Sequence, residues 1–566
     1  MPKGDLCWCQ KGVLVLLVIV AIGPGLRGAM RLTYHEALVA QGAREILESG
    51  NWWHPAIGNR PWLEKPPLPF WLVAAGGAVR GNVTPLEARL PSLLATMGLV
   101  IGVATLAARL YGTTVGLLSG AIQATTAWTL VRGRLAEADI ILACLVTWTF
   151  VALARIREPL GTDPLRIQEP PPGWRAWRWV FFGLLGLLSL VKGTGFGASL
   201  VLSAVMLLLI WERGGEFALR LWFPAGWGLV VALTATWPLL MVACYGTPVF
   251  GLWGLHVLER VLPSSGHGPF ASETWPVYLT GLIGQALPWS VLTLIGLGFA
   301  GRGHRNSDAP DGEGLSPQLL TGSSSIWDNR LLWAWTIAPL ILVSLPAGRK
   351  AHYAIHAQIP WSIWSALVLT QLAHLRRAQG VSAERLRRHT WALFASLGAA
   401  SGLLLGLVGP WVDERGVEWG FYEAAARQLA SGEPLVLLYD DWDRDPYPTP
   451  FGPIPHDLAV RLFYLDRPAC WHFLDGSLPA VDPVLGPCSH RDGQRFCPLA
   501  AASSGVGAPP RGPEGRSWAA IARPRDLPVL RRFGSVELLA WGPTVRQDRT
   551  YVLARVHPGG ESPVDP

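Results

Sequence analysis

The sequence predicts a mainly α-helical, polytopic membrane protein, a bundle of about eleven spanning helices followed by a small C-terminal α/β domain. Half of the 566 residues are hydrophobic and only 15% are charged, against roughly 25% in soluble globular chains. Apolar runs long enough to cross a bilayer recur up to residue 410 and are absent from 411–566. Such a composition excludes a disordered chain. A net charge of +7, spread over this length, also argues against a nucleic-acid partner.

The first expected span is Gly12–Met30, which follows Lys3 and Lys11. We interpret it as an uncleaved anchor rather than a signal peptide, because many more apolar runs follow. The other spans are expected at about 90–108, 113–130, 139–154, 178–191, 194–211, 221–243, 274–299, 330–346, 352–373 and 390–410.

Arginine-rich loops set the expected orientation. The loops at 155–178 and 374–389 each carry five arginines, and both fall on the cytoplasmic side if the N-terminus is cytoplasmic. The apolar stretch Leu68–Val79 is too short to cross easily, so we expect it to lie in the outer interface. The first exoplasmic loop then covers 31–88, within a membrane domain of residues 1–410.

Residues 411–566 are expected to form an exported domain. YEAAARQLASGEP predicts a helix that ends near Gly432, and PLVLLY predicts a buried strand. Val536–Trp541 and Tyr551–Val556 predict two more strands. An exported tail would also allow a disulfide among its three cysteines, which are Cys470, Cys488 and Cys497.

This topology brings ionisable side chains from five separate segments to the outer face. They include His35, Glu36, Arg44, Glu45, Glu64, Lys65, Arg132, Arg134, Glu137, Asp139, Lys192, His256, Glu259, Arg260, His267, Arg349, Lys350, His352 and Tyr353. Lysine and arginine are the usual donors to phosphate, and fixed cations stabilise the charge on a leaving phosphate. A carboxylate or an imidazole serves as base for an attacking hydroxyl or amine. The pattern indicates transfer to or from a phosphate-bearing lipid.

The segment HEALVAQGAREILESGNWWHPAIGNRPWLEKPPLPFWL resembles the first exoplasmic loop of family 39 glycosyltransferases. This family includes protein O-mannosyltransferases and lipid A aminoarabinose transferases, and it belongs to the GT-C superfamily. The similarity continues through EARLPSLLA, AEADIILACLV, LSLVKGTGFG, HVLERV, LPWSVL and SLPAGRKAHYAIHAQIP, and it covers about residues 12–372.

The resemblance implies an inverting enzyme of GT-C fold in the bacterial plasma (inner) membrane, with its active site on the outer face. It would move a sugar from a polyprenyl-phosphate donor to a lipid or protein acceptor among the membrane lipids. The site residues that it implies are Glu36, His35 and Asp139 for catalysis, Lys65, Lys192, Arg260, Lys350 and Tyr353 for the donor phosphate, and Glu64 and His267 for a divalent metal.

One departure from the family pattern concerns the base. The usual Asp-Glu pair at the start of the loop reads His35-Glu36 here, and the following Arg-Tyr reads Leu38-Val39. Either His35 or Glu36 takes the role of base, or the chain is an inactive membrane scaffold derived from such an enzyme. A polytopic transporter is a further alternative, which the lack of a sequence repeat and the position of the charges at span ends disfavour.

Overall fold

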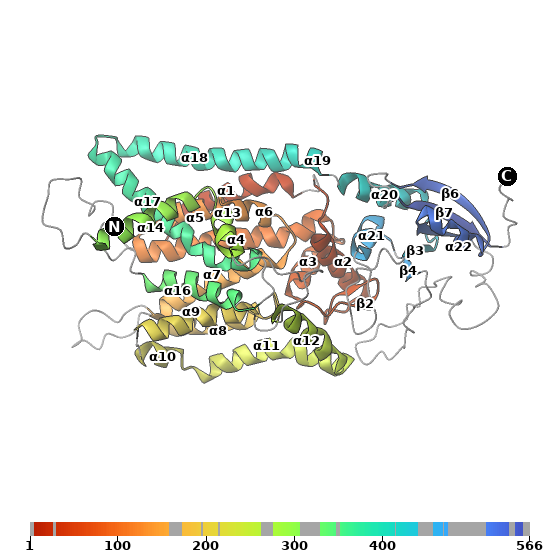
Figure 1. Cartoon of the computed structure of the whole chain (residues 1–566), viewed down its shortest axis with the longest axis horizontal. Coiled ribbons are helices and arrows are strands. Elements are labelled where there is room, and N and C mark those ends of the chain that lie inside the picture. The colour runs from red at the N-terminus through yellow and green to blue at the C-terminus, as the bar shows by residue number, and fades with distance from the viewer. Residues whose placement is uncertain are drawn as a thin grey trace. The chain divides into compact units, whose positions relative to one another are not determined.

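The structure is a computed structural model (Figure 1). It describes residues 5–26, 30–157, 173–193, 196–212, 215–261, 276–305, 329–346, 351–413, 415–439, 457–467, 469–473, 517–542 and 550–558. The chain forms two compact units, each built from segments that are distant in sequence. The first unit contains 1–26, 89–240 and 253–406, and the second contains 27–88, 241–252 and 407–566. The predicted boundary at residue 410 stays a prediction.

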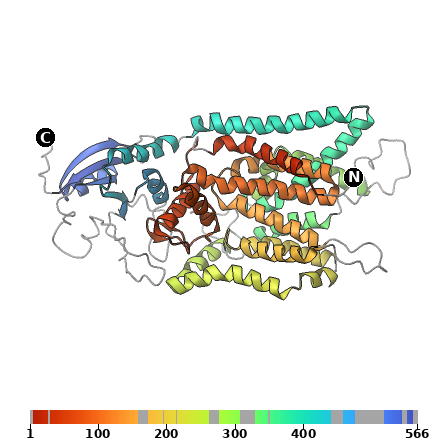
Figure 2. The same cartoon turned by 180° about the vertical axis from the view of Figure 1, so that it is seen from behind.

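The first unit is helical. Three of its helices, α4, α11 and α12, begin or end in the second unit. Its elements are α1 (Trp8–Ile22), α4 (Pro85–Tyr111), α5 (Thr113–Ala124), α6 (Ala127–Arg132), α7 (Ala138–Arg157), α8 (Trp174–Leu188), α9 (Phe196–Glu212), α10 (Gly215–Leu221), α11 (Pro224–Tyr245), α12 (Pro248–Val261), α13 (Val277–Gln285), α14 (Ser290–Arg305), α16 (Arg330–Ser344), α17 (Ile355–Ala378) and α18 (Ala383–Leu403). Figures 1 and 2 show the axes of α4, α7, α8, α9 and α18 roughly aligned with one another.

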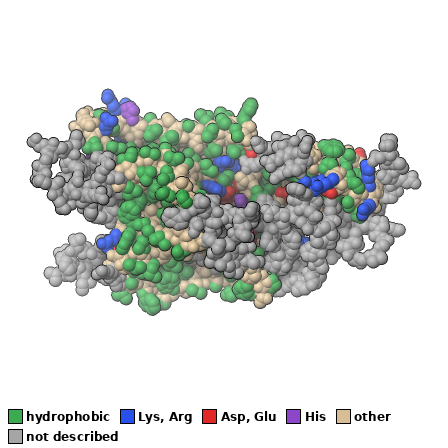
Figure 3. Space-filling view, viewed as in Figure 1, with side chains coloured by type: hydrophobic (Ala, Val, Ile, Leu, Met, Phe, Trp, Pro, Cys, Tyr) green, Lys and Arg blue, Asp and Glu red, His purple; other side chains and the backbone are tan. Residues whose placement is uncertain are grey.

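Apolar side chains cover much of the outside of this unit (Figure 3). On α9, Met206 and Ile210 are 59% and 65% exposed, and on α11 Val231 and Leu239 are 63% and 65% exposed. An apolar surface of this extent is typical of a bundle that faces lipid. The helices pack closely where glycine permits. A Cβ at Gly402 of α18 would lie 2.3 Å from the carbonyl oxygen of Val20 in α1.

Five described helices are long and apolar enough to cross a membrane, or six if the bent pair α13 and α14 forms one span. Four of them are α1, α4, α7 and α11, and the fifth is α18 with its continuation to Val412. All five coincide with expected spans. Helices α8, α9 and α16 also lie at expected spans but have only 15, 17 and 15 residues. The count of eleven therefore stays a prediction.

The second unit begins with the predicted exoplasmic loop. It contains α2 (Tyr34–Ser49), a hairpin of β1 (Ala56–Ile57) and β2 (Arg60–Pro61), and α3 (Leu68–Arg80). Helix α3 corresponds to the short apolar stretch of the sequence and has 13 residues, fewer than a span requires. The hairpin turns through Gly58 and Asn59, whose φ angles are 60° and 63°. Both values are typical of a type I′ turn.

The same unit holds the C-terminal sheet. Its elements are α20 (Arg415–Gln428), β3 (Leu435–Tyr439), α21 (Leu458–Leu465), β4 (Cys470–Phe473), β5 (Trp518–Ala522), α22 (Leu527–Arg531), β6 (Ser535–Trp541) and β7 (Val552–His557). The strand order is β4-β3-β5-β7-β6, with β3 parallel to both neighbours and the other pairs antiparallel. Strands β3, β6 and β7 coincide with the three predicted strands. Their core includes Val436, Trp518 and Val556.

Cysteine chemistry differs along the chain. Cys244, at the end of α11, is disulfide-bonded, whereas Cys7, Cys9 and Cys144 are free thiols. Cys488 and Cys497 lie outside the described residues, as does the side chain of Cys470, so the expected disulfide among these three stays a prediction.

Candidate active site

Three predicted site residues meet in the first unit. Asp139 lies in the first turn of α7 and is 7% exposed. Lys192, in the turn that follows α8, forms an ion pair and a hydrogen bond with the Asp139 carboxylate. The Lys192 ammonium also lies 5.4 Å from the ring centroid of Tyr353, within the range of a cation–π contact. Asp139, Lys192 and Tyr353 therefore form one cluster.

Two histidines complete this cluster. The ring of His352 packs edge-on against Tyr353, with centroids 4.5 Å apart. His356, in the first turn of α17, is 2% exposed and interacts electrostatically with both Lys192 and Asp139. Its Nδ1 is buried without a hydrogen-bond partner among the described residues. The sequence prediction did not include His356 among the site residues. Its only signal was its position three residues after Tyr353, close to one helical turn.

A second ion pair lies beside the cluster. Arg132, at the end of α6, pairs with Glu137, and the charge of Arg132 also acts on Asp139. The helical unit thus brings two cations and two carboxylates together from the end of α6, the start of α7 and the turn that follows α8. The Lys192 ammonium and the Arg132 guanidinium are the groups of this cluster whose N–H bonds can donate to a phosphate.

The two candidate bases begin α2, in the second unit. Glu36 is fully buried and closes a capping box with Thr33. Its carboxylate accepts a hydrogen bond from Thr33 N at 2.8 Å, and its own N–H donates to Thr33 Oγ1 at 3.2 Å. The side chain of His35 is exposed instead. The adjacent residues thus point in different directions, as the helical rotation of about 100° per residue requires.

Glu64 and Lys65 follow the hairpin and lie near each other. Lys65 Nζ is 3.9 Å from Glu64 Oε1, and the Lys65 side chain is 38% exposed. Glu64 Oε2 is buried and has no hydrogen-bond partner in the part of the chain that is described. A cation or a donor from a ligand would satisfy this oxygen.

The remaining predicted residues fall outside what the structure describes. His267 and Lys350 lie outside the described residues. Arg260 lies in α12, but its side chain is not described. Within the described ranges, no group of three or more His, Cys, Asp or Glu side chains could hold a metal ion. The expected metal ligands Glu64 and His267 therefore remain a prediction.

The motif AREILESGNW has a structural explanation in the second unit. Buried Arg44 donates to the carbonyl oxygens of Phe463 at 3.0 Å and Val83 at 2.9 Å. Glu45 accepts hydrogen bonds from the hairpin amides of Gly58 at 2.7 Å and Asn59 at 3.0 Å. Burial nevertheless raises the pKa of the Glu45 carboxyl above its usual value. Arg44 thus holds α2 against α21, and Glu45 holds α2 against the hairpin.

Further contacts join the first loop to the C-terminal region within this unit. Arg31 forms an ion pair with Glu423 of α20, and its second guanidinium nitrogen lies 2.9 Å from the other carboxylate oxygen. The hydroxyl of Tyr464 in α21 accepts a hydrogen bond from Leu32 N at 2.7 Å. No pattern in the sequence indicated that Arg31 and Leu32, which precede Glu36, would bind these distant residues.

Comparison with known proteins places these features in context. Residues 64–242 match the family model described as dolichyl-phosphate-mannose-protein mannosyltransferase. The undecaprenyl phosphate-α-4-amino-4-deoxy-L-arabinose arabinosyl transferase of Shewanella sediminis is 23% identical over 338 residues, 58% of this chain and 54% of that protein. The Pseudomonas aeruginosa (strain UCBPP-PA14) enzyme of the same name is 25% identical over 377 residues, 64% of this chain and 59% of that protein. The matched segments thus span little more than half the length of these relatives.

A solved structure shares the fold over nearly the whole chain. ArnT from Cupriavidus metallidurans, bound to undecaprenyl phosphate, superposes with a TM-score of 0.63 at 17% identity and covers 96% of this chain and 97% of that one. The apo form of the same protein gives the same TM-score. The resemblance inferred from the first loop is confirmed. By sequence and by fold, this chain resembles the GT-C glycosyltransferases, and in particular the aminoarabinose transferases.

Proposed function

We propose that the protein is an inverting glycosyltransferase that moves a sugar from a polyprenyl-phosphate donor to a lipid or protein acceptor. The observation that carries the proposal is the cluster of Asp139, Lys192 and Tyr353 in a chain of GT-C fold. The relatives are named for an undecaprenyl phosphate-linked aminosugar, and the solved neighbour holds undecaprenyl phosphate. These names support a polyprenyl-phosphate donor here.

Lys192 is the proposed electrostatic catalyst for departure of the lipid phosphate. As the bond from the sugar to the phosphate breaks, negative charge grows on the phosphate oxygen, and a fixed ammonium stabilises that charge. Asp139 holds the ammonium in place, and the Tyr353 hydroxyl supplies a hydrogen bond to the phosphate. Lys65, Arg260 and Lys350 are proposed to add further positive charge. A divalent metal at Glu64 and His267 would add to the same stabilisation.

The acceptor must lose a proton as it attacks the sugar from the face opposite the phosphate. Glu36 is the proposed base, because a carboxylate can take the proton of a hydroxyl or amine and is already in place at the start of α2. Its hydrogen bond to Thr33 N fixes one carboxylate oxygen. Exposed His35 is then proposed to orient the acceptor.

The proposed location is the outer face of the bacterial plasma membrane. Cys244 follows the expected span 221–243 on the side that the arginine-rich loops assign to the exterior, and it is disulfide-bonded. Disulfides persist in oxidising compartments. The free thiols Cys7 and Cys9 fall on the side assigned to the cytoplasm. Both observations support the orientation.

The test is transfer itself. Membranes that contain the full chain are incubated with labelled polyprenyl-phosphate sugars, and the labelled product is identified. Asp139→Asn should abolish most of the transfer, whereas Arg532→Leu, at an exposed arginine on the surface of the second unit, should leave it unchanged. If the wild-type chain transfers no sugar from any donor, the alternative of an inactive scaffold is favoured. The motivation for this alternative is His35, which stands where the resembling family usually has aspartate.

A further inference from the structure

The second unit contains a polar cleft that none of the proposed catalytic residues lines. Three parts of the chain form it: α2, the turn of the β1–β2 hairpin, and α21 with the chain that follows it. Its polar lining includes Gln41, Arg44, Glu45, Glu48, Asn59 and Arg467. The cleft lies wholly within the second unit.

Three buried polar atoms of residues that line this cleft lack hydrogen-bond partners among the described residues: Gln41 Oε1, Arg44 Nε and Arg467 Nη1. Gln41 is 5% exposed, and its Nε2 donates to Glu45 Oε1 at 3.0 Å, but its Oε1 accepts nothing. Arg467 Nη2 donates to the carbonyl oxygen of Ala430 at 2.7 Å, but its Nη1 donates to nothing. An unmet acceptor and an unmet donor at one cleft are costly unless a ligand satisfies them. A hydroxyl group can do both, since it donates and accepts.

The charges of the cleft are already compensated by the protein. The Glu45 carboxylate accepts from Gln41 and from the amides of Gly58 and Asn59. The Arg44 guanidinium donates to two carbonyl oxygens and lies 3.0 Å from Asp466 Oδ1. Two arginines and two glutamates line the cleft, so their formal charges cancel. A neutral ligand rather than an ion therefore fits.

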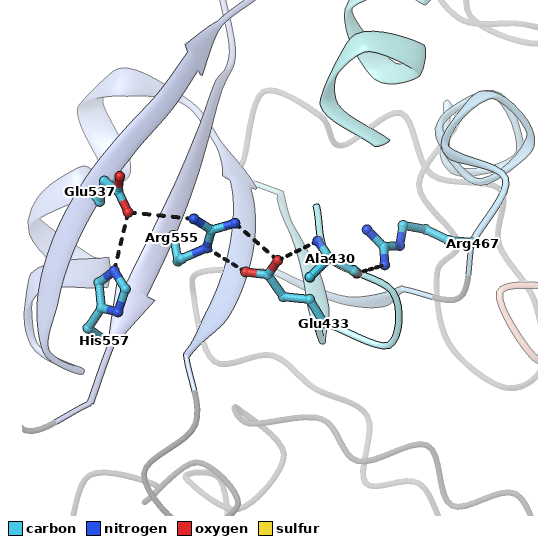
Figure 4. Close-up of polar contacts among 6 residues, drawn as sticks. All are labelled: Ala430, Glu433, Arg467, Glu537, Arg555 and His557. Carbon is cyan, nitrogen blue, oxygen red and sulfur yellow. Dashed lines mark hydrogen bonds and ion pairs between the residues drawn. The ribbon is translucent and has the colours of Figure 1, made fainter. Parts of the chain in front are cut away.

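The position of Arg467 is fixed by a chain of contacts that reaches the sheet (Figure 4). The Ala430 amide donates to Glu433 Oε2 at 2.9 Å, and Glu433 Oε1 accepts from Arg555 Nε at 2.6 Å. Arg555 lies on β7. The carbonyl that holds Arg467 thus belongs to a segment anchored to a strand. A donor held in this way loses little freedom when a ligand binds.

We propose that this cleft is a non-catalytic binding site for a neutral, hydroxyl-rich ligand of saccharide class. Its hydroxyl groups accept from Arg467 Nη1 and donate to Gln41 Oε1. The site is separate from the transfer chemistry, and binding to it requires no polyprenyl-phosphate donor.

The test is saturation-transfer NMR with methyl α-D-glucopyranoside as probe. The protein is the full chain with the substitution Asp139→Asn, held in lipid nanodiscs. This substitution suppresses transfer, so that binding alone is measured. Gln41→Met and Arg467→Met should each weaken binding at least about fivefold, since each removes one hydrogen bond to the probe. Arg532→Leu, the matched arginine control, should bind as the parent does, and Arg467→Lys should recover part of the affinity.

Thermal unfolding of each variant separates loss of binding from loss of fold. Weaker binding by variants that melt within a few degrees of the parent supports the proposal. Equal binding by the parent, Gln41→Met and Arg467→Met would overturn it. Inorganic phosphate and D-glucosamine are tested in parallel. Phosphate is an anion and protonated D-glucosamine is a cation. If the protein binds either ion more tightly than the neutral glucoside, and Arg467→Met or Gln41→Met removes that binding, the assignment of a neutral ligand is overturned.

Discussion

Lys192 forms an ion pair with Asp139, although 53 positions separate the two residues in the chain. The carboxylate sits at the N-terminal turn of α7, and the ammonium lies in the turn that ends α8. Antiparallel packing of these neighbouring helices brings the two termini together. A cation whose carboxylate partner and aromatic neighbour hold it in place is prepared for an incoming phosphate, because little reorganisation is needed at the moment of reaction.

Asp139 and Lys192 should therefore act as one unit in transfer. Asp139→Asn and Lys192→Met should each lower the rate by about 100-fold or more. The double variant should be no more than about tenfold slower than the worse single variant, since residues that act as a unit are not additive. Initial rates of labelled transfer, at matched protein amounts in membranes, give the comparison. A double variant whose loss equals the product of the single losses would show that the two residues act independently.

Lys65 is expected to bind the donor phosphate and to contribute little to the stability of the fold. Its side chain is 38% exposed, and its Nζ lies 3.9 Å from Glu64 Oε1. Lys65→Ala should cut transfer by about 100-fold or more, while the melting temperature stays near that of the wild type. Arg260→Ala should behave in the same way. Arg532→Leu controls for the loss of a positive charge elsewhere. Turnover at the wild-type rate in both variants would remove Lys65 and Arg260 from the donor site.

Four variants separate the role of the base from that of the helix cap. Glu36→Gln removes the charge and should lower the rate by at least about 100-fold. Thr33→Val breaks the capping box without touching the carboxylate, so it should cost about 1 kcal/mol of stability with a far smaller effect on the rate. His35→Asn should lose less than Glu36→Gln, and His35→Asp should remain active. Rates and melting temperatures are measured together for all of them. An active Glu36→Gln beside an inactive His35→Asn would make the imidazole the base.

Local pattern was enough to predict the long apolar helices and three of the described strands. Long apolar runs located α1, α4, α7, α11 and α18 because hydropathy alone decides whether a segment can cross a bilayer. Short β-rich runs located β3, β6 and β7. Strands β4 and β5 were not predicted, since CWHF and WAAIA are too brief for a period of two to be recognised.

Contacts between residues that lie far apart in the chain could not be predicted from the sequence. The two compact units mix early and late segments, and 27–88 shares a unit with 407–566. Arg44 illustrates the difficulty. It was predicted only as one of many outer-face charges, yet it donates to Phe463, 419 positions away. The acidic and basic residues of the first loop thus divide into a structural group, with Arg44 and Glu45, and a group proposed for chemistry, with Glu36 and Lys65. Only tertiary packing makes that division.

Cysteine labelling in intact cells tests the orientation. Cys7 and Cys9 are exposed free thiols near the N-terminus, which is expected in the cytoplasm. A membrane-impermeant maleimide should therefore leave both unlabelled until the cells are opened. A cysteine placed at exposed Arg532, in a variant that lacks Cys7 and Cys9, should add labelling in intact cells relative to the same variant without it. Labelling of Cys7 or Cys9 from outside, or protection of the residue at 532, would reverse the topology.

Glu433 predicts how the stability of the C-terminal region depends on pH. Burial raises the pKa of its carboxyl, but hydrogen bonds from Arg555 and the Ala430 amide outweigh burial and leave the pKa below its ordinary value of 4.5. An acid whose pKa is lower in the folded state contributes stability that is fully present above the unfolded pKa and is lost as pH falls through the folded pKa.

At pH 7 the wild type should therefore be more stable than Glu433→Gln by about 1–3 kcal/mol. That difference should shrink as the pH falls below the ordinary carboxyl pKa of 4.5 and through the lower pKa of the folded state, and apparent melting temperatures of both proteins between pH 7 and pH 3 measure it. Arg555→Met serves as the control, because it removes the main hydrogen-bond donor to Glu433 and should abolish most of the pH-dependent difference. A gap between wild type and Glu433→Gln that stays constant down to pH 3 would mean that the carboxylate charge contributes nothing to the fold.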